Sequence, residues 1–331
     1  MLSLTVSSPL LADDGAASIA AGGIVVMKQE PRIVMAKEVL NISATKVVVN
    51  YDFRNDSSDD ITTEVAFPIP AYELNIDGAS PDKQGFDDFK LWIDRQPTKF
   101  ITATRAFVGE RDITDSLSKL HVDAGSFGHF VWNNDANSHK YGPNYLDLDR
   151  LSKLQLARLS QEKIISNVDE HEPLWRVEKK YHWSQTFPAH AVVHIRHEYT
   201  PVIGNTNSAS YGLLQAKEDP DSAKELATIC IDPALRRTLL KHVGDAKTSV
   251  PVFFVDFILT TANTWKTPIE DFTLNVERFQ AKGADQSFVS FCWDGSIQKI
   301  DPNNFTMHVN NLIPKKELRI GYIQVFTDKV N

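Results

Sequence analysis

Cysteine is nearly missing from this chain of 331 residues, which contains only Cys230 and Cys292. Two cysteines are too few for a disulfide framework, and a zinc cluster would need further ligands. Two interpretations of the pair stay open on these grounds. One is a single bridge that closes a long loop in an exported protein, and the other is two separate buried thiols in a cytosolic one.

The chain also lacks clustered positive charge and long apolar runs. It has 35 Lys and Arg against 43 Asp and Glu, a net charge of −8, and its basic residues are scattered. We therefore expect no nucleic-acid partner, because capture of a phosphate backbone needs clustered positive charge. No apolar run reaches the ~18 residues of a membrane-spanning helix, so we expect no transmembrane segment in the mature chain.

The N-terminus resembles part of a secretory signal. Residues 1–12 (MLSLTVSSPLLA) are apolar and small, and Asp13 then begins a different composition. The apolar core of a signal peptide follows a basic residue and ends in small residues near the cleavage site. Here no Lys or Arg precedes the apolar stretch, and Leu10 is larger than the small residue expected two positions before Ala12. We interpret residues 1–12 as a truncated signal-peptide remnant, with the native start upstream, and expect a periplasmic or secreted protein. The alternative is a frayed apolar tail.

Residues 181–201 carry the clearest strand pattern. Trp183 and Phe187 alternate with polar residues on a first arm, and Val193 belongs to a matching alternation on a second arm after Pro188. Side chains of a strand point alternately to two faces, so this period of two indicates half-buried strands. We predict that the two arms pair as a hairpin in one sheet, with Trp183 opposite Val193.

The same periodicity predicts β structure on both sides of a different segment. Residues 13–111 are expected to form an N-terminal β-sandwich region, in which Phe67-Pro68 ends a strand because Pro cannot donate to a ladder. Residues 112–170 show apolar spacings of three to five and are expected to be a mostly helical insertion, with an amphipathic helix across roughly 146–165. Residues 171–331 return to β, apart from a short helix near 233–243 that begins at Asp232-Pro233. The predicted fold is therefore mainly β, with two antiparallel β-sandwich-like regions and a helical insertion between them.

Several stretches together resemble an exported bacterial family of unknown function, the domain-of-unknown-function family 4424. They are, in chain order, residues 20–25 (AAGGIV), 47–55 (VVVNYDFRN), 65–70 (VAFPIP), 183–189 (WSQTFPA), 197–201 (HEYTP), 230–232 (CID), 262–265 (ANTW), 268–272 (PIEDF) and 290–292 (SFC). Residues taken as structural motif positions within them are Gly22, Gly23, Phe67, Pro68, Trp183, Phe187, Pro188 and Trp265. The resemblance implies a mature start near Asp13 and makes Cys230 and Cys292 matching positions, which favours their bridge. It implies no catalytic residue, because the family has no established activity.

Titratable groups are densest on the predicted hairpin. His182, His190 and His194 fall on its polar face, where two imidazoles could hold zinc or copper if another ligand came from elsewhere. The simpler interpretation, which we favour, is a wet sheet face that carries histidines. His197 falls on the apolar face and is expected to be a hydrogen-bonded core histidine.

Two further observations concern single side chains. Asp256 interrupts an otherwise apolar strand, and structural ion pairing is the expected reason. Tryptophans could stack on sugars, although core packing is the default for such side chains in strands. The tryptophans concerned are Trp175, Trp183, Trp265 and Trp293.

The alternation of apolar and polar residues along the chain predicts β-sheets, and no motif of comparable strength indicates catalysis. We therefore expect an exported binding or envelope-associated structural module that acts on an unidentified protein or small ligand, with no cofactor and no catalytic residue. A metal-dependent enzyme or metal-binding protein that uses the histidine-bearing face of the 181–199 hairpin is the second hypothesis. A sheet edge that binds a peptide by strand addition is the third.

Overall fold

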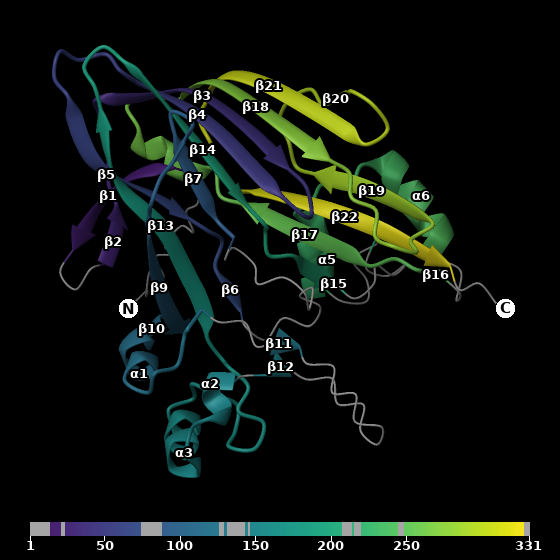
Figure 1. Ribbon diagram of the computed structural model, residues 1–331. Coiled ribbons are helices and arrows are strands. Elements are labelled where there is room, and N and C mark those ends of the chain that lie inside the picture. The colour runs from purple at the N-terminus through teal and green to yellow at the C-terminus, as the bar shows by residue number, and fades with distance from the viewer. Residues whose placement is uncertain are drawn as a thin grey trace, which may run out of the picture.

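The computed structural model describes residues 14–20, 24–73, 88–125, 129–130, 143–144, 146–206, 214, 220–243 and 248–327. Their fold is mainly β, as the sequence predicts, and three larger sheets dominate it (Figure 1). The motif glycines 22 and 23 lie outside the described residues, as does the interpreted signal remnant of residues 1–12. No helix among the described residues is long and apolar enough to cross a membrane.

The first sheet has seven strands and takes most of its strands from the N-terminal β region. In spatial order they are β10 (Arg111–Asp112), β9 (Ile101–Val108), β13 (Arg176–Phe187), β5 (Ile61–Pro68), β1 (Gly15–Ala20) and β2 (Ile24–Met27), with β6 (Tyr72–Glu73) also paired to β13. Pro68 is the last residue of β5, where the sequence predicts a strand end.

The second sheet has eight strands and combines both β regions. Its order is β20 (Gln298–Lys299), β21 (Asn304–Leu312), β18 (Ile269–Glu277), β3 (Ile33–Ile42), β4 (Val47–Asn55), β14 (Val192–Tyr199), β7 (Lys90–Ile93) and β8 (Gln96–Pro97). The regions join where β18 runs parallel to β3, with Leu274 beside Leu40. Every other pairing in this sheet is antiparallel.

The third sheet has five strands and belongs to the C-terminal part. They are β15 (Gly204–Thr206), β17 (Val252–Phe257), β22 (Leu318–Thr327) and β16 (Thr248–Ser249), with β19 (Gln286–Phe291) paired to β22. A short ribbon pairs β11 (His129–Phe130) with β12 (Pro143–Asn144). The helical elements are α1 (Thr114–Ser118), α2 (Leu146–Asp149), α3 (Lys153–Gln161), α5 (Pro220–Ala227), α6 (Pro233–Val243) and the 3₁₀ helix η1 (Thr260–Thr264).

The prediction that residues 181–201 form a paired hairpin is wrong. Trp183 on β13 pairs with Val65 in the seven-stranded sheet, whereas Val193 on β14 pairs with Phe53 in the eight-stranded sheet. The chain crosses from one sheet to the other between Phe187 and Val192, so the two apolar faces meet across the core. Alternation identifies the buried face of a strand, but it cannot tell a neighbour in the same sheet from one across the core.

One continuous cluster of buried apolar side chains connects the three sheets. It contains Phe53 and Phe187, whose ring centroids lie 5.8 Å apart between the first two sheets, and also Phe272 and Tyr322 from the second and third. A smaller second cluster lies between the five-stranded sheet and the α5–α6 segment and includes Ile229 and Ile323. The eight-stranded sheet therefore contributes to a core that both β regions share.

Helix α3 shows why the expected helix over residues 146–165 is two helices. Ser152 lies between α2 and α3 and caps α3, because its hydroxyl accepts from the Gln155 backbone N–H while the Gln155 side chain accepts from the Ser152 backbone. Such a reciprocal capping box fixes a helix start. Helices α1, α2 and α3 lie together at one end of the molecule (Figure 1). The helix expected near 233–243 corresponds to α6, with Asp232 accepting from the amides of Ala234 and Leu235.

Candidate functional site

The three histidines proposed as metal ligands do not come together. His182 lies on the seven-stranded sheet, and its Nδ1 is 2.6 Å from Glu64 Oε1. His194 lies on the eight-stranded sheet, and its Nδ1 is 2.6 Å from Asp52 Oδ1. Each alternates with a core-facing neighbour, so each points away from the core on a different side of the sandwich. In the part of the chain that the structure describes, no group of three His, Cys, Asp or Glu side chains is arranged to hold a metal.

His190 precedes β14 in the turn between the two sheets, at a φ of +53°. Its backbone N–H donates to the Ser57 carbonyl over 3.2 Å. Neither of the other two proposed ligands shares this turn. His190 and His194 are exposed, whereas His182 is buried, so the interpretation of a wet sheet face is wrong for His182.

His197 is fully buried among aromatic rings. Its ring centroid lies 4.8 Å from that of Phe67 and 5.4 Å from that of Trp183, and its Nε2 is 3.4 Å from Asp14 Oδ2. Burial lowers the pKa of His197 to about 3, because the ring has no water to solvate a positive charge. The carbonyl of Asp14 accepts from the Trp265 indole N–H over 2.6 Å. The residues around His197 thus hold the start of β1 within the core.

Asp256 is explained by its partner on the neighbouring strand. Asp256 on β17 lies directly opposite Arg319 on β22, and the guanidinium donates to both carboxylate oxygens over 2.6 and 2.8 Å. A bidentate pair of this kind needs the planar fork of arginine. The prediction of structural ion pairing is confirmed.

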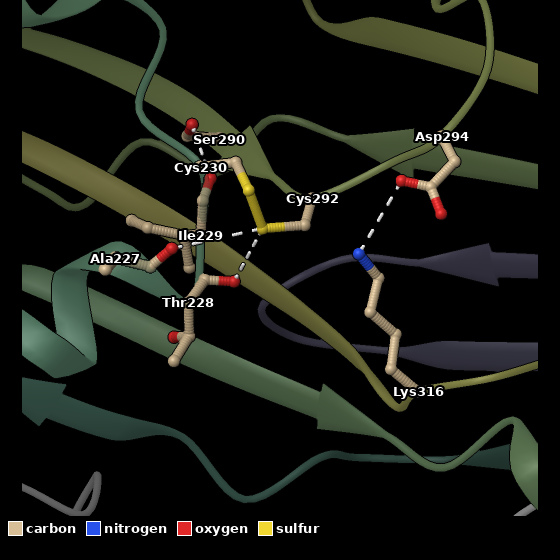
Figure 2. The surroundings of a disulfide bond; sticks show 8 residues. All are labelled: Ala227, Thr228, Ile229, Cys230, Ser290, Cys292, Asp294 and Lys316. Carbon is tan, nitrogen blue, oxygen red and sulfur yellow. Dashed lines mark hydrogen bonds and ion pairs between the residues drawn. A yellow bond between two sulfur atoms is a disulfide. The ribbon is translucent and has the colours of Figure 1, made fainter.

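Cys230 and Cys292 form a disulfide that links the α5–α6 connection to the end of β19, with a Cα–Cα distance of 4.9 Å (Figure 2). Beside it, the Ser290 hydroxyl donates to the Ile229 carbonyl over 2.8 Å. Ile229 packs onto Gly321 of β22 so closely that a methyl group at Gly321 would lie 2.4 Å from Ile229 Cδ1. The connection is therefore fixed against the five-stranded sheet by a covalent bond, a hydrogen bond and close packing.

A groove of about 200 Å³ opens next to this disulfide. One lip contains residues 292–295, which follow β19, and the other contains residues 312–318, which connect β21 to β22. Trp293 forms part of the lining, and its indole stacks on Phe272 with centroids 5.8 Å apart and an angle of 23°. Its indole N–H is buried and has no hydrogen-bond partner among the described residues. The groove thus has an aromatic wall that is held in place by stacking on Phe272.

The second lip is fixed by the 3₁₀ helix η1. Glu317 accepts from the Leu259 backbone N–H over 2.7 Å and from the Thr260 hydroxyl over 2.6 Å. The Asn263 side-chain amide donates to the Pro314 carbonyl over 2.8 Å. Both lips are therefore held by bonds that exist without a ligand.

Charged side chains lie at the rim of the groove. Lys316 Nζ is 3.7 Å from Asp294 Oδ1, so this ion pair joins the two lips (Figure 2). Lys315 is exposed and makes no ion pair within the described part of the chain. The carboxylate of Glu317 is already occupied by the donors of η1. The groove consequently combines an apolar interior with a rim on which two lysines face one available aspartate.

Sequence reasoning identified only part of this site. Cys292 is a matching position of the resemblance and Trp293 is one of the tryptophans considered for stacking, but the other lip lies in a region that the sequence predicts only as β structure. Residues 313–317 (Ile-Pro-Lys-Lys-Glu) have no periodic pattern. The adjacent Lys315 and Lys316, close to Ile313, are the signal that could have marked this segment.

Comparisons with known proteins point to one family. A family model described as "Domain of unknown function (DUF4424)" matches residues 12–320. Among curated proteins, none matches the chain. Among solved structures, the chain is similar to the crystal structure of a "putative nutrient binding protein" from Legionella pneumophila subsp. pneumophila str. Philadelphia 1, with 14% sequence identity and a TM-score of 0.42. That similarity covers 95% of this chain and 73% of the other.

Proposed function

The chain belongs to the DUF4424 family, and we propose that it is an exported binding module that holds a small ligand in the groove beside its disulfide. The observation that carries the proposal is the groove itself, with a volume of about 200 Å³ and lips that are fixed in advance. Sites for small molecules are usually concave, mostly apolar and largely preformed, with a few polar groups for orientation.

The volume sets the size of the ligand. A dry apolar cavity of about 150 Å³ accommodates the six carbon atoms of benzene, so about 200 Å³ suits a ligand with roughly eight non-hydrogen atoms. Binding free energy per non-hydrogen atom falls from about 1.5 kcal/mol for the best very small ligands to about 0.3 kcal/mol for drug-sized ones, so about 0.5–1 kcal/mol per atom is expected at this size. We therefore expect dissociation constants in the millimolar to micromolar range for simple probes.

Preformed walls favour binding over a structural role for this groove. The disulfide orders the lip at Cys292, and Glu317 and Asn263 order the lip at residues 312–318. A ligand would thus not have to supply the free energy that orders two loops. A surface that only scaffolds other components has no need of such a hollow.

The proposed location follows from the same bond. Disulfides form and persist in oxidising compartments such as the bacterial periplasm, and Cys230 and Cys292 are joined. We expect the native gene to yield a periplasmic protein that starts at Asp13 or Asp14 and whose mass is two hydrogen atoms below that of the same chain with free thiols. A full-length cytosolic product with two free thiols would contradict export.

The other two hypotheses have less support. The metal hypothesis needs His182 and His194 together, but they lie on different sheets. The peptide-edge hypothesis needs an accessible strand, and it loses support at the eight-stranded sheet, whose outermost strands, β8 and β20, are two residues long. Short edge strands are poor templates for strand addition. The edge strands β2 and β19 of the other two sheets have four and six residues and are the places where it could still apply.

Binding in the groove can be tested with 1-octanol, a neutral probe of suitable size, by following backbone amide shifts in NMR. We expect saturable shifts at residues 293–295 and 312–317. Ile313→Asp should weaken binding at least threefold, because Ile313 lines the groove, is 56% exposed and can change without disturbing the core. Ile101→Asp is the matched control, since Ile101 is 62% exposed and lies on β9 of another sheet. Shifts that do not saturate, or that Ile313→Asp leaves unchanged, would contradict the proposal.

A further inference from the structure

The rim of the groove indicates which chemical class of ligand it selects. We infer that the groove takes a small amphipathic acid, with its apolar part against Trp293 and its anionic group at Lys315 and Lys316. This inference rests on the proposed binding function and adds the identity of the ligand's polar group.

The first step concerns the two acidic side chains at the groove. Glu317 accepts hydrogen bonds from the Leu259 and Thr260 backbone amides and from the Thr260 hydroxyl. These bonds direct both carboxylate oxygens of Glu317 at η1 and away from other partners. Glu317 therefore stabilises the lip, and its oxygens are not free to pair directly with a cationic group in the groove.

The second step concerns the remaining acid. Asp294 is 91% exposed and lies 3.7 Å from Lys316, which is 57% exposed. Ion pairs between exposed side chains contribute little, because water and salt screen the attraction and two flexible side chains must be ordered. The pair can therefore open at little cost, and Lys316 can exchange Asp294 for an anionic group that enters the groove.

The third step concerns the charged groups that a ligand can contact directly. Lys315 is exposed and makes no ion pair within the described residues, so Lys315 and Lys316 offer two ammonium groups, whereas Asp294 is the one carboxylate at the rim whose oxygens η1 does not engage. Direct charge-assisted hydrogen bonds to these ammonium groups favour an anionic ligand group over a cationic one. The apolar interior, formed by side chains such as Leu259, Trp293 and Leu312, favours a hydrocarbon or aromatic tail.

The test compares three probes that share one tail, namely octanoate, 1-octanol and octylammonium, at pH 7 and low salt. We expect octanoate to bind about fivefold more tightly than 1-octanol and octylammonium to bind more weakly than 1-octanol, as measured by amide shifts at residues 293–295 and 312–317. Added salt should reduce the preference for octanoate and leave 1-octanol unchanged.

Substitutions at the rim test whether its charged side chains cause the preference for octanoate over 1-octanol. Lys316→Gln and Lys315→Gln should each reduce the ratio of octanoate to octanol affinity at least twofold, and Asp294→Asn should increase it by releasing Lys316. Lys90→Gln is the matched control, because Lys90 is 56% exposed and lies on β7. The variants change exposed side chains, and the unchanged affinity for 1-octanol reports that the groove is intact.

The outcomes separate this inference from the function on which it rests. Equal binding of octanoate and 1-octanol in the groove, or tighter binding of octylammonium, would overturn the acid preference and leave the binding module standing. The absence of saturable shifts with all three probes would overturn both. An octanoate preference that survives Lys315→Gln combined with Lys316→Gln would overturn the assignment to these lysines.

Discussion

Removal of the disulfide is the sharpest test of how the C-terminal part of the chain is held together. The bond joins residues separated by 62 positions, and its loop encloses α6, β17, β18 and β19. Closing a loop of that length lowers the entropy of the unfolded chain by about 14 cal/mol/K, which corresponds to about 4 kcal/mol at 25 °C. We therefore expect Cys230→Ala combined with Cys292→Ala to lower the free energy of unfolding by about 4 kcal/mol.

The assay is urea unfolding followed by tryptophan fluorescence and by circular dichroism, on oxidised protein, reduced protein and the double variant. With a urea m value of about 3 kcal/mol/M, a loss of about 4 kcal/mol moves the midpoint down by about 1.3 M. The reduced protein should behave like the variant, and a reductant should not affect the variant itself. This last measurement is the control for effects of the reductant on other parts of the protein.

One result would refute the reasoning. If the double variant loses less than about 1 kcal/mol, the bond does not constrain the unfolded chain as the loop length predicts. The packing of Ile229 on Gly321 and the hydrogen bond from Ser290 would then hold the α5–α6 connection without it. A second transition seen only by one probe would show instead that the five-stranded sheet unfolds separately, and a single free energy would no longer describe the protein.

Two further predictions concern tight packing and burial. Gly321→Ala should lower the free energy of unfolding by about 1–3 kcal/mol, since the new methyl group meets the branched side chain of Ile229. Gly204→Ala is the control, because a methyl group there has Phe254 Cβ at 3.9 Å as its nearest neighbour. It should lower the free energy of unfolding much less in the same urea assay. His197 has its pKa lowered to about 3 in the folded protein, so the unfolded chain binds more protons between about pH 6.5 and pH 3. Titration of His197 therefore leaves the free energy of unfolding unchanged above about pH 6.5. Between about pH 6.5 and pH 3 it lowers this free energy by about 1.4 kcal/mol for each unit by which the pH falls. NMR should show a neutral His197 ring at pH 5, and a protonated ring at that pH would contradict the expectation.

Sequence periodicity predicts the strands of this protein well, but it does not predict which strands are neighbours. Alternation placed Trp183 and Val193 correctly on buried faces, yet they pair with Val65 and Phe53 of different sheets. The face of a strand depends on local spacing, whereas pairing depends on where the chain turns. That turn, at Phe187-Pro188, looked like a hairpin loop in the sequence.

The sequence predicts a helix start where a side chain caps the helix with a specific hydrogen bond. Asp232 before α6 accepts from two amides, as its position before Pro233 indicates. Ser152 and Gln155 show the pattern of a capping box, which explains the division of the expected long helix. The groove could not be predicted in this way, because residues 292–295 and 312–318 come together only through the pairing of β21, β22 and β19 with other strands.

The lips of the groove are supported by different parts of the chain, and this has a consequence for the N-terminal strand. Glu317 and Asn263 attach one lip to η1, and the same helix holds the start of β1, since the Ala16 N–H donates to the Thr264 hydroxyl over 3.0 Å. Trp265, directly after η1, donates to the Asp14 carbonyl. The 3₁₀ helix thus links a segment at the start of the described chain to one near its end. Because the two contacts share one rigid element, anything that dislodges β1 should also loosen the lip at Lys315 and Lys316, while the lip held by the disulfide stays in place.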